Sequence, residues 1–195
     1  MNRKVMFALF VLMIFPLLAC QVTYSLPQSR AKLIPETTEE IVIPIPADQS
    51  QSPELTIQFG AGNLTINPGA QDNLVEGTAV YNVSEYKPVV TTNGNQVTLS
   101  VGDKNLHFSS TPEIKNIWDL KLSSVPMDLE ILAGGYQGDY ELGGLSLQNL
   151  RVSEEGSQTT LSFSSPNNAS METFKYETGA SQVKLEAWGM RIFRT

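Results

Sequence analysis

Residues 147–186 read LQNLRVSEEGSQTTLSFSSPNNASMETFKYETGASQVKLE, and this stretch contains the same apolar pattern twice. The matching positions are Leu147, Leu150 and Val152 in the first copy and Met171, Phe174 and Tyr176 in the second. Glycines recur at a similar interval, at Gly134, Gly156 and Gly179. A period of roughly 20–25 residues is typical of one coil of a β-solenoid, where inward apolar residues stack coil upon coil.

Short runs of alternating apolar and polar residues occur on both sides of this stretch, and no segment has a convincing helical period. Asn93-Gly94 predicts a hairpin turn, and the prolines of IVIPIPADQ (41–49) allow an edge strand at best. We therefore expect an all-β domain over residues 41–195, built as a solenoid-like stack with a period of about 22–24 residues. A β-sandwich, whose strands and turns also recur regularly, is the alternative.

Two glycine-rich stretches, GAGN (60–63) and LAGGYQG (132–138), lie between the expected strands. Neither precedes a helix, so the context does not fit a phosphate-binding loop. We expect them to form tight corners at which glycine allows a positive φ.

The N-terminus combines a basic head, Arg3-Lys4, with an apolar run that ends in Leu-Leu-Ala-Cys at Cys20. The run is short for a membrane span and has the layout of a secretory signal. Its last four residues resemble the lipobox of bacterial lipoproteins, in which the cysteine is lipidated and becomes the new N-terminus. This resemblance implies a signal peptide over residues 1–19 and a membrane anchor on Cys20, the only cysteine in the chain. The alternatives are a plain signal peptide with an incidental cysteine, or an uncleaved N-terminal anchor.

Residues 20–40 are polar and contain prolines, which predicts a flexible tether between the lipidated cysteine and the domain. Cleavage before Cys20 leaves 11 basic and 20 acidic residues, a formal charge of −9 compared with −7 for the precursor. Because such a domain repels phosphate backbones, we do not expect a nucleic-acid partner.

The sequence contains no credible catalytic or metal-binding set. His107 is the only histidine and has no nucleophile motif near it, so a surface position explains it better than a catalytic triad does. One histidine and one cysteine cannot build a zinc site, and the pairs Asp128/Glu130 and Asp139/Glu141 fit solvated outer-face charges better than a calcium site. We predict neither an enzyme nor a cofactor.

Three aromatic residues, Trp118, Tyr136 and Tyr140, are weak candidates for a sugar- or peptide-binding strip. Packing in the core or at corners explains these aromatic residues equally well.

The segments FGAGNLTI (59–66), the stretch from Trp118 to Asn167 and METFKYETGASQVKLE (171–186) resemble bacterial "toast-rack" domains of unknown function. Those domains are relatives of the putative-adhesin β domains and of the C-terminal domain of LiaF-type cell-wall-antibiotic response proteins. The resemblance covers roughly Glu39 to Ala187 and implies an exposed, repetitive β-stack in a bacterial envelope. In the LiaF-type relatives such a domain accompanies a membrane segment and restrains a sensor kinase.

After Glu186 the pattern changes to AWGMRIFRT. We expect either that Trp188–Phe193 folds back as a cap or that the chain is a truncated relative of longer proteins. The function predicted from the sequence is a lipid-anchored protein on the extracytoplasmic face of the cell membrane. Its non-catalytic β domain would bind an envelope protein or a cell-wall component, in envelope-stress sensing. The alternative is a passive adhesive or structural surface protein.

Overall fold

The computed structural model describes residues 32–48, 50–102 and 114–187. Within these residues the chain forms eleven β-strands, one 3-10 turn (η2, Ser84–Tyr86) and no α-helix, which confirms the all-β prediction. The strands are β1 (Leu33–Pro44), β2 (Glu54–Phe59), β3 (Gly62–Ala70), β4 (Asn73–Val83), β5 (Pro88–Asn93), β6 (Gln96–Val101), β7 (Asn116–Ser123), β8 (Met127–Glu141), β9 (Leu147–Phe163), β10 (Thr173–Thr178) and β11 (Gln182–Ala187).

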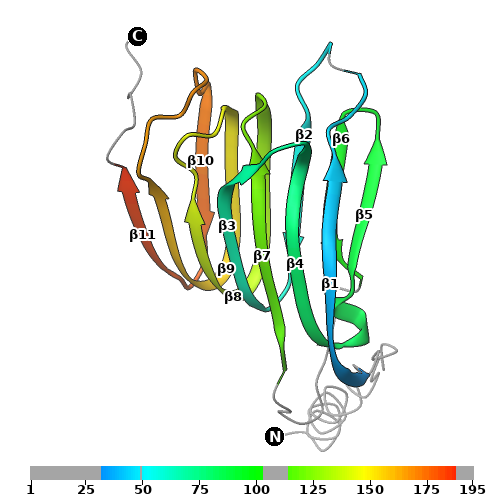
Figure 1. The fold of residues 1–195 in the computed structure, drawn as a ribbon. Coiled ribbons are helices and arrows are strands. Elements are labelled where there is room, and N and C mark those ends of the chain that lie inside the picture. The colour runs from blue at the N-terminus through cyan, green and yellow to red at the C-terminus, as the bar shows by residue number, and fades with distance from the viewer. Residues whose placement is uncertain (1–31, 49, 103–113, 188–195) are drawn as a thin grey trace, which may run out of the picture.

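Four coils stack on one another through parallel strand pairing. The first coil is β2 with β3, the long strands β8 and β9 each form a bent coil, and β10 with β11 forms the last (Figure 1). Each coil therefore has two arms. The first layer comprises β2, β10 and the N-terminal arms of β8 and β9, and the second layer comprises β3, β11 and the C-terminal arms. Both layers contribute inward side chains to one hydrophobic cluster.

The register between coils confirms the repeat at the C-terminal end. Phe174 pairs with Leu150 and Tyr176 with Val152, as the spacing predicted. Between β8 and β9 the step is shorter, and Gly156 pairs with Gly135 and not with Gly134. The step is shorter because the connection from β8 to β9 has fewer residues than the one from β9 to β10. The two layers share a core as in a sandwich, but the parallel stacking is that of a solenoid.

The N-terminal end of the stack is closed by strands that lie in the chain before β2 or between the first two coils. In the second layer β7 pairs with β3, and β4 and β1 follow in antiparallel order. In the first layer β6 pairs with β2, and the hairpin to β5 turns at Asn93-Gly94 as predicted, with Gly94 at φ +60°.

Strand β1 is an edge strand, as the prolines predicted, but it begins earlier than expected. It runs from Leu33 and pairs with β4 from Leu33↔Val83 onward, so the predicted boundary between tether and domain near residue 40 is wrong. Residues 33–40 look like linker because most of their side chains face solvent. Their pairing depends on backbone groups, and Tyr81 adds a hydrogen bond from its hydroxyl to Glu39 at 2.9 Å.

The glycine-rich corners confirm the expectation only in part. Gly62 has φ +130°, a conformation that favours glycine. In LAGGYQG no glycine has a positive φ, so the prediction that these glycines allow a positive φ is wrong. Gly138 instead provides space: a Cβ at this position would lie 2.8 Å from the ring of Tyr136 and 3.1 Å from Thr159.

Candidate interaction surfaces

The three aromatic candidates lie in the core. Trp118, Tyr136 and Tyr140 are exposed to solvent by only 0%, 5% and 0%, so the predicted aromatic surface strip is wrong. Trp118 contacts Phe59 edge-on with ring centroids 5.2 Å apart, and Tyr136 stacks on Tyr140 at 6.5 Å. The core position of Trp118 could have been predicted from period-two alternation, because Trp118 lies on the same strand face as the buried Leu120.

A buried carboxylate lies beside these tyrosines, at the bend of β9. Glu154 is 4% exposed and accepts hydrogen bonds from the hydroxyls of Tyr136 (2.7 Å) and Thr159 (2.9 Å) at one oxygen. Thr178, from the last coil, donates to the other oxygen at 3.3 Å, and Tyr140 donates to Tyr136 at 2.7 Å. Sequence reasoning missed this cluster, although Glu154 follows Leu150 and Val152 on the inward positions of the strand.

The hydroxyl groups determine the charge state of Glu154. Burial alone would raise its pKa, but the hydrogen bonds from Ser157, Tyr136 and Thr159 outweigh burial, and the pKa lies below its ordinary value. The tyrosines respond in the opposite direction, since burial raises the pKa of Tyr136 and Tyr140. The cluster therefore contains one carboxylate charge held by neutral hydroxyls, an arrangement that links the last three coils.

The outer face of the first layer has a shallow hollow of about 380 Å³ over β2, β8 and β9. Its polar side chains bond to one another along the stack. Asn149 donates to Asp128 at 2.8 Å, Thr56 donates to Glu130 at 3.5 Å, and Arg151 pairs with Glu130 at 3.7 Å. The carboxylates Asp128 and Glu130 thus lie on the outer face, as expected, with protein partners.

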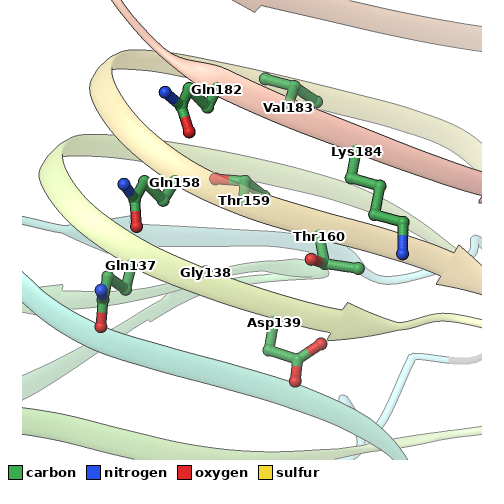
Figure 2. Close-up of a pocket in the computed structure, with 9 residues that line it drawn as sticks. All are labelled: Gln137, Gly138, Asp139, Gln158, Thr159, Thr160, Gln182, Val183 and Lys184. Atoms are coloured by element: carbon green, nitrogen blue, oxygen red, sulfur yellow. The ribbon is translucent and has the colours of Figure 1, made fainter.

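The outer face of the second layer has a similar hollow of about 420 Å³ over β8, β9 and β11 (Figure 2). Gln137, Gln158 and Gln182 form one column in it, and Asp139, Thr160 and Lys184 form the next. Within the described chain, the three glutamine side chains, Asp139 and Thr160 have no side-chain hydrogen bond or ion pair. Only Lys184 is paired, with Glu186 at 2.6 Å. This face therefore presents unused hydrogen-bonding groups.

The C-terminal end of the stack is open where the described residues end. The inward positions of β10 and β11 carry Phe174, Tyr176 and Val183, which are half-buried, and Leu185, which is 53% exposed. Both strands pair with β9 on one side only. The predicted cap at Trp188–Phe193 lies outside the described residues.

Other predicted features also fall outside these residues, namely the signal peptide, the lipidation site Cys20 and His107. Among the residues that are described, no three His, Cys, Asp or Glu side chains are grouped so that they could hold a metal ion. The same part of the chain contains no helix long and apolar enough to cross a bilayer.

The fold resembles solved structures of low sequence identity. A protein from Clostridium sporogenes, named a putative cell adhesion protein, aligns with a TM-score of 0.62 at 14% identity. The alignment covers 78% of this chain and 99% of that protein. A putative adhesin from Bacteroides fragilis is 8% identical, with 78% and 96% covered and a TM-score of 0.29. At these identities the first likeness concerns the fold alone, and the second is too weak to support an argument.

No curated protein matches the chain. A family model described as the N-terminal domain of toast_rack, DUF2154, matches residues 33–186, from the first residue of β1 to the last residue but one of β11. The match has the same N-terminal boundary as the folded domain and spans most of the chain. The chain therefore belongs to the family of N-terminal toast_rack domains.

Proposed function

We propose that this chain is a non-catalytic cell-envelope protein that is anchored by a lipid on Cys20 and displays its β domain to a partner. The partner is an envelope protein or a cell-wall component, and envelope-stress sensing is the setting that the toast-rack relatives suggest. The observation that carries the proposal is the outer face of the second layer. There Gln137, Gln158 and Gln182 offer hydrogen-bonding groups that the described protein does not use.

The contrast between the two outer faces supports this assignment. On a solvated sheet face, pairing between polar side chains changes the stability of the fold only slightly. Stability therefore does not explain why one face pairs its polar groups and the other does not. The first layer nevertheless pairs its polar groups across neighbouring strands, whereas the second layer has the same parallel geometry and leaves its glutamines free. A binding surface requires such free groups, because each must exchange water for a ligand atom.

The short connection to the proposed anchor also fits a role close to the membrane. Eleven residues lie between Cys20 and Lys32, the first residue described, so the two are twelve steps apart along the chain. Fully extended, this connection spans at most about 40 Å. A domain held at that distance samples partners in the membrane or in the nearest wall layer.

Labelled fatty acid incorporation tests the anchor. We expect the wild-type chain and a Ser25→Ala control to incorporate label, and Cys20→Ser to incorporate none. Equal labelling of the wild type and Cys20→Ser, or no label in the wild type, would refute the anchor.

The partner is tested by crosslinking in cells, with a photoreactive residue at Gln158 on the free face or at Thr56 on the paired face. We expect a defined adduct from position 158 and none from position 56. The same random abundant adducts from both positions would contradict a binding role for the second layer.

A passive adhesive or structural role is the second candidate, favoured by the fold likeness to the Clostridium sporogenes protein named a putative cell adhesion protein. Deleting the gene distinguishes the two candidates. The binding proposal expects an altered envelope-stress response, whereas the passive role expects altered surface attachment with an unchanged stress response.

A further inference from the structure

The free glutamines belong to a longer column of amides on the second layer. Asn63 on β3 pairs with Gln137 on β8, Gln137 with Gln158 on β9, and Gln158 with Gln182 on β11. We call these four residues the amide ladder. All four side chains are exposed, and Figure 2 shows the three glutamines one above another, extending in the same direction. Neighbouring strands lie about 4.8 Å apart, so the ladder presents one amide at each step across four strands.

A second column runs alongside the amide ladder, two positions further along each strand. It consists of Thr65, Asp139, Thr160 and Lys184. Each strand thus contributes one amide and one hydroxyl or charged group to the same face. Asp139 and Lys184 carry opposite charges, so the column has no strong net charge of its own.

The chemistry of the amide ladder favours a polyhydroxylated ligand. A primary amide both donates and accepts hydrogen bonds, as do sugar hydroxyls and N-acetyl groups. One sugar unit in an extended β-linked glycan advances the chain by nearly one strand spacing, so successive units can meet successive amides. The contacts are individually weak, and repetition along the ladder raises the overall affinity.

Charge and backbone geometry disfavour other ligands. The chain has a formal charge of −7, which repels anionic polymers such as nucleic acids and polyphosphates. A peptide that adds a strand needs a free sheet edge, and among the ladder strands β3, β8 and β9 have neighbours on both sides. In the described residues β11 pairs on one side only, and a strand added at that edge would not contact the amides of the other three strands.

We propose that the amide ladder binds a neutral, extended glycan chain that runs across β3, β8, β9 and β11, with about one sugar unit per strand. This inference rests on the proposed function, since it names the cell-wall component that the second layer would contact. The glycan lies on the outer face and requires no change in the core.

Binding is measured by calorimetric titration of the full chain carrying Cys20→Ser, which lacks the proposed lipid site. The probes are hexamers of β-1,4-linked N-acetylglucosamine and of β-1,4-linked glucose. We expect saturable binding of at least one hexamer. We expect the combined variant Gln137→Ala/Gln158→Ala/Gln182→Ala to weaken binding by about tenfold or more, because three hydrogen-bonding groups are lost.

The matched control changes amides on the first layer, Gln96→Ala/Asn149→Ala, and we expect its affinity to stay within about twofold of the parent. If the triple variant does not fold, as judged by its thermal unfolding, Gln158→Ala alone is expected to weaken binding by about threefold. Binding of neither hexamer, or equal losses in the ladder and control variants, would overturn the glycan assignment. A protein adduct at position 158 in cells without glycan binding would refute this inference while leaving the proposed function intact.

Discussion

The two ends of the stack differ in how far their inward apolar side chains are buried. At the N-terminal end, β1 and β4 extend the second layer, and their inward residues Ile41 and Tyr81 are buried. On β5, which extends the first layer, the inward Val90 is 46% exposed although its partner Leu99 is fully buried. At the C-terminal end of the described residues, β10 and β11 have no further strand beside them, and Leu185 is 53% exposed. Figure 1 shows these ends on opposite sides of the molecule. Both β1 and β11 have a strand on one side only among the described residues, yet Ile41 is buried and Leu185 is exposed. Alternation is alike in the two strands, so the segments that pack over each inward face decide burial.

Different interactions stabilise each end. At the N-terminal end β1 and β5 approach each other and help to close the core. Near the C-terminal end part of this apolar packing is replaced by hydrogen bonds around Glu154, to which Thr178 of the last coil donates. In addition, the backbone amides of Gly179 and Ala180 donate to the carbonyls of Glu154 and Glu155. Hydrogen bonds thus help to hold the last coil in place, whereas packing of buried apolar side chains holds the strands at the N-terminal end.

The largest expected effect comes from two leucines in one column of the second layer. Leu120 on β7 and Leu185 on β11 are linked by successive register pairs through Ile66, Tyr140 and Leu161. Leu120 is fully buried, so Leu120→Ala should lower the free energy of unfolding by about 2–5 kcal/mol. Leu185→Ala should cost less than about 1 kcal/mol, because that side chain is largely hydrated already.

Urea denaturation of both leucine variants measures this difference. Equal losses of stability would mean that the C-terminal end is covered as well as the N-terminal one, which would remove the contrast between the ends.

A smaller effect is expected at the bends between the two arms. At Gly62, in the first coil, φ is +130° and an added Cβ would overlap the carbonyl oxygen of Asn116. Gly62→Ala should therefore cost about 1–3 kcal/mol from the backbone conformation, in addition to the cost of moving that carbonyl. At Gly156, in the third coil, the nearest atom lies 3.9 Å away and φ is not positive, so Gly156→Ala should be tolerated. Thermal unfolding of the pair provides the test, and a similar fall in Tm for both would contradict this account of the bends.

The smallest expected effect concerns Glu154 and depends on pH. Its folded-state pKa is lowered from an ordinary value of 4.5, so ionised Glu154 stabilises the fold above that value. This stabilisation should be lost as the pH falls below about 4.5 and through the folded-state pKa. Glu154→Gln should cost about 1–2 kcal/mol at neutral pH, because the charged acceptor of the Tyr136 and Thr159 hydroxyls is gone.

The informative measurement is the difference in unfolding free energy between the wild type and Glu154→Gln across the acidic range. We expect this difference to shrink as the pH falls. A difference that does not change with pH would show that the carboxylate charge makes no contribution to stability. Glu130→Gln on the outer face is a suitable control.

Much of the fold could be predicted because the apolar residues within each strand indicate which of its side chains face the core. Leu150, Val152, Phe174 and Tyr176 were assigned to matching places from spacing alone, and the parallel pairs of β9 and β10 confirm this. The candidate site was predicted less well. Trp118, Tyr136 and Tyr140 were considered as surface groups because aromatic side chains often bind ligands. Each of them nevertheless lies on the strand face that the period-two alternation assigns to the core.

The amide ladder could not be found in the sequence, because its members come from β3, β8, β9 and β11 at unequal intervals. Four strands, β4 to β7, lie in the chain between Asn63 and Gln137, whereas Gln137 and Gln158 lie on consecutive strands. Only the register of the strands brings the four amides into one column. Which groups are then free depends on the neighbours of each side chain, and spacing contains no such information.

The sequence by itself determined the strand content, the inward and outward faces and the repeat of the last coils, because a β-strand alternates its side chains regardless of what lies beside it. The tertiary structure decided where β1 begins, since residues 33–40 become a strand only by pairing with β4. It also decided which end of the core is covered and which polar face is free. These properties arise from contacts between segments far apart in the chain, and local alternation cannot specify them.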